Sequence, residues 1–252
     1  MHDLPVDGAG KVMVEASAVE DLRPVSRPRA VPSIACMSNI RRWAASAALA
    51  VGAATMYRRV VRPWMYAWGA RADEVDVVLT GDDLVSASTP RTTRAVSIDA
   101  SIEAVWPWLV QIGEDRGGFY SYDWLERAVG AHIHNTQIVH PEWQDLSVGD
   151  SVWLARRYGQ RARQVVADIE PKSHLVLMSE PDFDQMARGE KASGAWGFYL
   201  RPDDGPSRLL ARGSGGAVGH VTFDVPHFVM EQKMLRGIRQ RVERARWVGP
   251  AC

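Results

Sequence analysis

Cysteine is nearly absent from this chain, and its absence excludes several classes of protein. The two cysteines, Cys36 and Cys252, lie far apart, and no CxxC or zinc-ligand spacing occurs. A disulfide-rich secreted scaffold and a zinc-finger fold are therefore excluded. Cys36 follows a polar, proline-rich stretch and not an apolar run, so it lacks the context of a lipoprotein cysteine.

The chain also lacks an excess of charge of either sign. Its 30 Lys and Arg residues balance 30 Asp and Glu residues, so the formal net charge is zero. An overall electrostatic attraction to nucleic acid is therefore missing, and no nucleic-acid partner is expected. At 46% hydrophobic and 24% charged residues, the composition is typical of a globular protein.

A long apolar run is missing as well. The uncharged segment Trp43–Tyr57 is shorter than the roughly 20 residues that span a bilayer, although arginines flank both of its ends. Because long basic side chains can reach toward the lipid headgroups, two alternatives stay open. Residues 40–62 form either a single membrane-anchoring helix, which makes the protein membrane-associated, or an alanine-rich helix of a cytoplasmic protein.

The segments around this helix carry weaker signals. Residues 1–36 have no helical period and are expected to form a disordered tail. Met37 directly precedes the basic and apolar segment, so one hypothesis places the start of translation there and not at Met1. Residues 63–90 are expected to be a linker. The linker carries three aromatic side chains, Trp64, Tyr66 and Trp68. Rings beside basic residues suit a membrane interface, but they equally suit packing on the next domain.

A regular pattern over residues 91–247 predicts one folded domain. Alternating apolar residues from Arg94 to Ile98 predict a strand, and apolar positions from Ile102 to Ile112 recur at helical spacing. Pro107 lies inside that helix, so we expect a kink or a break there. A second short helix is expected from Asp123 to Gly130.

Antiparallel strands are expected to follow. Turn compositions join consecutive apolar segments into hairpins. The expected strands are Ser151–Ala155, Arg163–Ile169, His174–Ser179, Ala195–Leu200 and Arg208–Arg212. Residues 180–193, between two hairpins, are expected to be a polar loop.

A long amphipathic helix is expected to close the domain. Asp224 and Pro226 suit its start, and Gly249-Pro250 suits its end. Its apolar stripe includes Met230 and Met234. Several antiparallel strands with few helices indicate an α+β fold. Since a long helix must bury its stripe, we expect it to lie on a bent sheet and to enclose a cavity there.

These residues also resemble a known family. SIDASIEAVWPWLVQIG, starting at Ser97, is similar to the opening of the SRPBCC (START-like, polyketide cyclase/dehydrase-like) superfamily. GGFYSYDWLE from Gly117 and PHFVMEQKML from Pro226 resemble an actinobacterial branch whose function is not established. The resemblance covers about Arg91 to Arg246. It implies a helix-grip fold, in which a curved antiparallel sheet surrounds a long C-terminal helix behind an N-terminal hydrophobic helix. It also implies an apolar pocket for lipids, sterols or polyketides.

Aromatic and methionine side chains are the candidates for lining that pocket, because ligand sites combine large rings with few polar groups. Each of them has core packing as an equally good alternative. The candidates are Trp108, Tyr120, Tyr122, Trp143, Trp153, Trp196, Phe198, Met230 and Met234.

Firm catalytic candidates are lacking. No GxSxG nucleophile motif occurs. Weak acid/base candidates are Asp123, His134, Glu142 and His227. For each of the four, a structural role is the favoured interpretation. His132 and His134 would point to opposite sides of an extended loop, so no metal site is expected, and no cofactor is expected either.

Three functions remain open at this point. The favoured one is binding, transport or sequestration of a small hydrophobic ligand. The second is a cyclase or dehydratase type of enzyme that uses the same pocket. The third is a non-catalytic stress or assembly factor. The polar content of the pocket distinguishes the first two, because an enzyme needs at least two titratable groups that face each other.

Overall fold

The computed structural model describes residues 34–122, 133–203 and 205–247. Contacts divide the chain into two compact units, Met1–Ala50 and Val51–Cys252. Several expectations lie outside the described residues. They concern residues 1–33 of the expected tail, the helix Asp123–Gly130, His132, and the helix end at Gly249-Pro250.

The alanine-rich segment forms a helix, as expected from the high helix propensity of alanine. This helix, α1 (Ile34–Met56), continues through a π-helical segment, η1 (Tyr57–Val61), into α2 (Arg62–Tyr66). Within the described residues, no helix combines the length and the apolar character that are needed to cross a bilayer. The expected membrane-anchoring helix over residues 40–62 therefore gains no support.

The domain is built on one six-stranded antiparallel sheet in the order β1-β6-β5-β4-β3-β2. Its strands are β1 (Arg91–Ile98), β2 (Ser151–Trp153), β3 (Arg163–Glu170), β4 (His174–Ser179), β5 (Gly194–Pro202) and β6 (Ser207–Gly215). The predicted hairpins β3–β4 and β5–β6 are confirmed. The first strand of the domain pairs with the last one, which places β1 at one edge beside β6.

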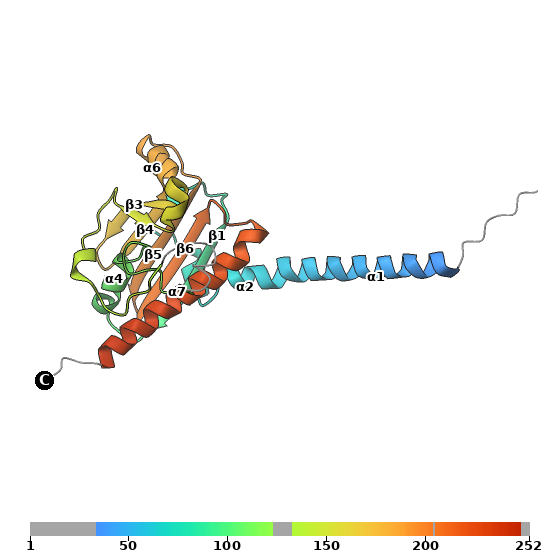
Figure 1. The fold of residues 1–252 in the computed structure, drawn as a ribbon, viewed down its shortest axis with the longest axis horizontal. Coiled ribbons are helices and arrows are strands. Elements are labelled where there is room, and N and C mark those ends of the chain that lie inside the picture. The colour runs from blue at the N-terminus through green and yellow to red at the C-terminus, as the bar shows by residue number, and fades with distance from the viewer. Residues whose placement is uncertain (1–33, 123–132, 204, 248–252) are drawn as a thin grey trace, which may run out of the picture. The chain divides into compact units, whose positions relative to one another are not determined.

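The C-terminal helix lies across one face of this sheet, which we call the inner face (Figure 1). This helix, α7 (Val221–Trp247), buries Met234, Leu235, Ile238 and Val242 against the inner face. Each such side chain contributes about 1.5–3 kcal/mol when it is fully buried. The α+β fold with a helix-grip-like arrangement of sheet and C-terminal helix is therefore confirmed.

No helix break occurs at Pro107, and the expected start of the last helix at Asp224 and Pro226 was wrong. The helix α4 (Ile102–Val110) continues through Pro107, and α7 begins at Val221, before Asp224, and contains Pro226. A proline removes only one backbone hydrogen bond, and both helices are held by packing on the sheet. Packing therefore outweighs the local cost of each proline.

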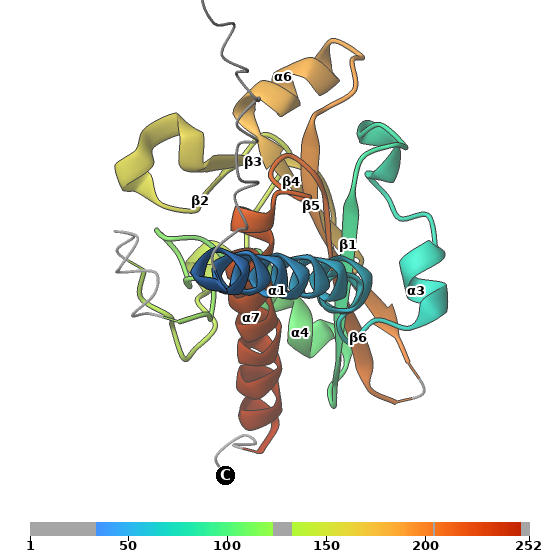
Figure 2. The same ribbon diagram turned by 90° about the vertical axis from the view of Figure 1, so that its right-hand side faces the viewer.

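The opposite, outer face of the sheet is covered by residues 70–85, which lie within the segment 63–90 that the sequence assigns to a linker. This segment carries α3 (Ala72–Asp76) and a short 3-10 helix, η2 (Asp82–Leu84). Leu79 and Val85 join a second apolar cluster with outer-face side chains of the sheet. Figure 2 shows α3 beside the sheet and away from α7.

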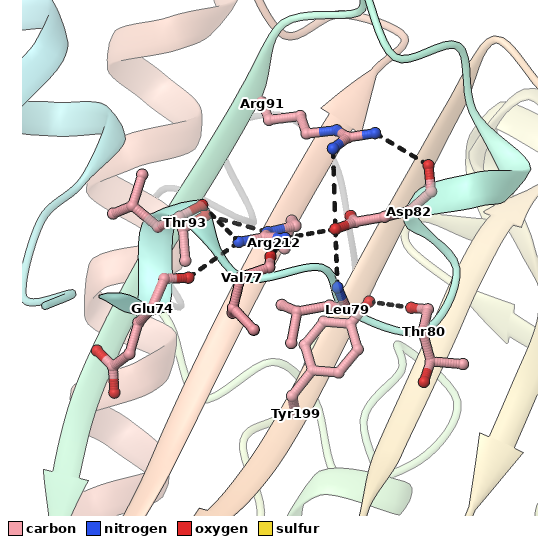
Figure 3. Close-up of polar contacts among 10 residues, drawn as sticks. Glu74, Val77, Leu79, Thr80, Asp82, Arg91, Thr93, Tyr199 and Arg212 are labelled. Carbon is pink, nitrogen blue, oxygen red and sulfur yellow. Dashed lines mark hydrogen bonds and ion pairs between the residues drawn. The ribbon is translucent and has the colours of Figure 1, made fainter. Parts of the chain in front are cut away.

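Two buried arginines hold this segment to the outer face, and Figure 3 shows the contacts of one of them, Arg212. Arg212 donates to Asp82 Oδ2 at 2.5 Å, to Thr93 Oγ1, and to the carbonyl oxygens of residues 74, 75 and 77. Arg208, four residues earlier on β6, donates two hydrogen bonds to the Glu74 carboxylate. Both arginines are almost fully buried. Glu74 and Asp82, in the segment that the sequence assigns to a linker, thus neutralise the two buried arginines of β6.

The expected polar loop over residues 180–193 contains a helix instead, α6 (Glu180–Ala187). Ser179 caps it by accepting a hydrogen bond from the Asp182 N–H, and Pro181 stands in its first turn. Both features favour a helix start. Phe183 and Met186 pack against the outer-face cluster, which supplies the apolar contact that a short helix needs. Two further 3-10 helices are η3 (Pro141–Trp143) and η4 (Arg156–Ala162).

The aromatic residues after the arginines pack on the domain, which confirms the alternative to a membrane interface for their rings. Trp64 and Trp68 contact Phe228 edge to face, and Tyr66 donates a hydrogen bond to Asp224 at 2.8 Å. These contacts join α2 and Trp68, two residues after its end, to the first half of α7.

Replacing Arg212 tests whether the outer layer depends on its ion pair. Arg212→Met should lower the free energy of unfolding by about 3–5 kcal/mol, because it leaves Asp82 buried without its close cationic partner. Arg239→Met serves as the control, since Arg239 pairs with Glu243 on the exposed side of α7. Urea unfolding followed by circular dichroism gives both values. Equal effects of the two substitutions would contradict the role of Arg212.

Candidate functional site

A cavity of about 500 Å³ lies at one end of the sheet beneath the first half of α7. Its apolar wall comes from several elements. This wall includes Phe119, Ile133, Leu154, Ala155, Tyr158, Ala162, Trp196, Val218, Phe223, Pro226, Met230 and Met234. The polar lining side chains are Ser121, Gln164, Ser179, Asp182, Ser214, His227 and Glu231. The cavity therefore joins a large apolar surface to a small number of polar groups.

The space arises because side chains on the inner face of β6 become smaller toward its end. Leu209 and Ala211 fill the core, whereas Gly213 and Gly215 line the cavity. Gly213 of β6 pairs in register with Trp196 of β5, so β6 places no side chain beside the indole ring at this position. The inward-facing residues of β6 thus fill the core at one end of the sheet and leave space for the cavity at the other.

A buried ion pair stands at the wall of the cavity. Arg94 of β1 donates to Glu231 of α7 at 2.5 Å, and the two side chains are 0% and 1% exposed. Arg94 also donates to the carbonyl oxygen of Met65, and its guanidinium lies over the Phe228 ring. Trp196 Nε1 donates to the other carboxylate oxygen of Glu231 at 2.6 Å. This pair fixes the position of α7 above the sheet.

Glu231 remains ionised in this setting. Burial alone would raise the pKa of its carboxyl. The charge of His227, when that ring is protonated, the charge of Arg94, and the hydrogen bonds from Arg94 and Trp196 lower it overall. Removing one partner of such a buried pair costs about 3–5 kcal/mol.

His227 lies one helical turn before Glu231 and also lines the cavity. Burial lowers the pKa of its imidazole, and Arg94 lowers it further, against the opposing effect of Glu231. Arg94 Nη1 lies 3.1 Å from His227 Nδ1. Because a guanidinium can only donate, Nδ1 accepts and the ring proton is on Nε2. His227 is thus a neutral imidazole that presents an N–H donor.

Four of the residues proposed from the sequence line this cavity. They are Trp196, Met230, Met234 and His227. Their roles in binding or catalysis remain predictions. Trp196 stacks on Phe119 with ring centroids 6.3 Å apart, and His227 stacks on Phe223 at 4.8 Å.

The other ring candidates lie outside the lining of this cavity. Trp108, Tyr120 and Phe198 are buried in the core, and the Tyr120 hydroxyl donates to the Trp108 carbonyl oxygen. The Trp143 ring lies tilted against His140 with ring centroids 4.1 Å apart, and Arg156 lies over the Trp153 ring. The Tyr122 ring faces Lys233. A cluster of rings in the sequence does not tell which rings fill the core.

The remaining acid/base candidates are not brought together. His134 is exposed. Its neighbour Asn135 accepts a hydrogen bond from the Tyr120 N–H and thereby anchors this loop. Glu142 is exposed and pairs with His140 at 3.1 Å. Asp123 and His132 lie outside the described residues.

Sequence reasoning missed Arg94 and Glu231, although both carry a signal. Arg94 shares the inner side of β1 with Val96 and Ile98. Glu231 lies in the apolar stripe of α7, three residues after Phe228 and four before Leu235. A charge of each sign inside an apolar pattern indicates a buried pair.

Comparison with known proteins gives fold-level similarities of low score. No family model and no curated protein matches the chain. Protein MLL2253 from Mesorhizobium loti is 14% identical over 62% of this chain and 98% of its own, with a TM-score of 0.38. Protein NE0264 from Nitrosomonas europaea is 10% identical over 62% and 95%, with a TM-score of 0.40. CalU16 from Micromonospora echinospora is 13% identical over 62% and 85%, with a TM-score of 0.30. No function is assigned from these values.

The lowered pKa of His227 predicts a particular pH dependence of stability. The unfolded chain binds a proton at the ordinary histidine pKa of 6.5, whereas the folded chain binds it only at lower pH. The free energy of unfolding should therefore fall as the pH drops from 6.5 toward the folded pKa. The lowered pKa of Glu231 acts in the same direction, but only below its ordinary value of 4.5.

Urea unfolding at a series of pH values measures this effect. In His227→Gln, the free energy of unfolding should decline much less just below pH 6.5 than it does in the wild-type chain. His220→Gln, at an exposed position just before α7, should keep it. Parallel profiles for the wild-type chain and His227→Gln would show that His227 does not titrate as described.

Proposed function

We propose that this chain is a helix-grip protein of the SRPBCC type that binds a small hydrophobic ligand in the cavity beneath α7. The cavity itself carries the proposal. Its volume of about 500 Å³ falls within the roughly 300–1,000 Å³ of small-molecule sites. Its wall of rings, methionines and aliphatic side chains offers an apolar ligand a favourable transfer from water.

Two further features support binding. Met230 and Met234 place flexible thioether side chains on the α7 wall, and such side chains adapt to irregular ligand shapes. The motifs from Ser97 and from Pro226 that resemble the SRPBCC superfamily lie mainly in β1, α4 and α7, which form or support the inner face. Other members of that superfamily bind lipids, sterols and polyketides, which agrees with an apolar cavity.

An enzyme of cyclase or dehydratase type is the second candidate. One observation favours it, because two titratable groups, His227 and Glu231, stand 3.7 Å apart in the cavity wall. Glu231 is held by Arg94 and Trp196, so His227 is the group of this pair that would exchange a proton with a substrate. A general acid or base needs such a position within reach of the substrate.

A cavity-filling substitution tests ligand binding. Met230→Trp should reduce the affinity for the neutral fluorescent dye Nile red by about tenfold or more, because the added ring occupies the ligand's space. Val229→Trp introduces the same ring at the neighbouring, exposed position of α7 and should leave the affinity unchanged.

Fluorescence titration gives both affinities, and thermal unfolding checks that both variants fold. If Nile red binds neither the wild-type chain nor the control, the binding proposal is wrong. If Nile red binds Met230→Trp and the wild-type chain with equal affinity, its binding site is not the cavity beneath α7.

A further inference from the structure

The charged side chains of the cavity wall all have the same sign. Among the described residues that line it, the charged ones are Asp182 and Glu231, and none is a lysine or an arginine. A carboxylate that entered this apolar space would lose its hydration and would meet no lysine or arginine among the described lining residues. Burial of an unpaired charge is strongly unfavourable.

Asp182 belongs to the local structure of the wall. Its Oδ1 accepts hydrogen bonds from the N–H and the hydroxyl of Ser193, at 2.6 and 2.7 Å. Its Oδ2 accepts from the Ser179 hydroxyl at 2.6 Å. All of these donors are neutral, so the negative charge is stabilised by hydrogen bonds and remains close to the ligand space.

Arg94 lies behind this wall, because it pairs with Glu231, which lines the cavity, while Arg94 itself does not. Arg94 is fully buried, and its Nη1 is engaged by Glu231 and His227 while its Nε donates to the Met65 carbonyl oxygen. Its Nη2 is buried and has no hydrogen-bond partner among the described residues, yet Arg94 is not among the lining residues. A ligand carboxylate would have to displace Glu231 in order to reach it.

His227 supplies an N–H donor to the cavity wall, beside the neutral polar side chains of Ser121, Gln164, Ser179 and Ser214. Its Nδ1 accepts from Arg94, so Nε2 carries the proton. This Nε2 lies 3.7 Å from Glu231 Oε1, which is longer than a hydrogen bond. An N–H donor at an apolar wall favours a ligand that brings an oxygen acceptor.

We propose that the cavity selects an uncharged apolar ligand that bears a carbonyl or ester oxygen for His227 Nε2–H, and that it excludes carboxylates. This inference rests on the proposed function, because it names the ligand class of the same cavity. Glu231 is then the residue that determines specificity, because it is already paired with Arg94, the cation that a ligand carboxylate would need.

A matched series of ligands with a ten-carbon chain tests the inference on the wild-type protein by displacement of Nile red at neutral pH. The series is methyl decanoate, decane, decanoate and decylamine. Methyl decanoate should bind about tenfold more tightly than decane, because it adds one hydrogen bond in an apolar site. Decanoate should bind most weakly. Tighter binding of decanoate or of decylamine than of methyl decanoate would overturn the inference, and so would equal binding of all four. Failure of Nile red and of every ligand would instead refute the proposed function.

Two variants locate the selectivity. His227→Phe keeps a ring at the same place and should reduce the affinity for methyl decanoate to that for decane, whereas exposed His220→Phe should change neither. Glu231→Gln leaves Arg94 without a carboxylate partner, so it should raise the affinity for decanoate by about tenfold. If Glu231→Gln does not fold, the ligand affinities of the wild-type chain and of His227→Phe still test the inference. Unchanged ligand preferences in His227→Phe would contradict the role of its N–H.

Discussion

The ion pair between Arg94 and Glu231 is the interaction on which the site depends. It joins the edge strand β1 to α7 in a region that water does not reach. The same guanidinium holds the carbonyl oxygen of Met65, and the same carboxylate holds the indole of Trp196. One pair therefore sets the positions of the helix, the strand and the aromatic wall. Because a buried pair adds little net stability over apolar packing, we interpret it as a device for specificity of arrangement.

Charge pairing organises both faces of the sheet at β1 and β6. Arg94 faces inward and meets an acid of α7, while Arg208 and Arg212 face outward and meet acids of residues 74–82. The alternation of strands sends these side chains to opposite faces. The segment before the domain is thereby built into the fold, and the inner face is left free for α7 and the cavity.

Much of the fold could be predicted from the sequence because its signals are local. The alternation in β1, the turn compositions of the hairpins and the period of α7 each lie within a few residues. The outer layer could not be predicted in this way, since Glu74 and Asp82 find their arginines more than 100 positions later. The helix α6 had a local signal, Ser179 before Pro181 and Asp182, which a polar composition concealed.

The candidate site was predictable to a smaller extent. Residues on regular elements were placed by their period, so Trp196, Met230, Met234 and His227 meet in one cavity. The rings between Trp106 and Trp143 gave no such guide, since Trp108 and Tyr120 serve the core. The empty space itself follows from glycines at the end of β6, whose effect depends on what the neighbouring strand places opposite them.

Nuclear magnetic resonance of methionine methyl groups tests the central claim most directly, because the chain carries reporters inside and outside the cavity. With methyl decanoate bound, the methyl signals of Met230 and Met234 should shift and show through-space contacts to the alkyl chain. Met178, in the outer-face cluster, should remain unchanged. Unchanged Met230 and Met234 signals in the presence of the ligand, or contacts to Met178 alone, would contradict a binding cavity beneath α7.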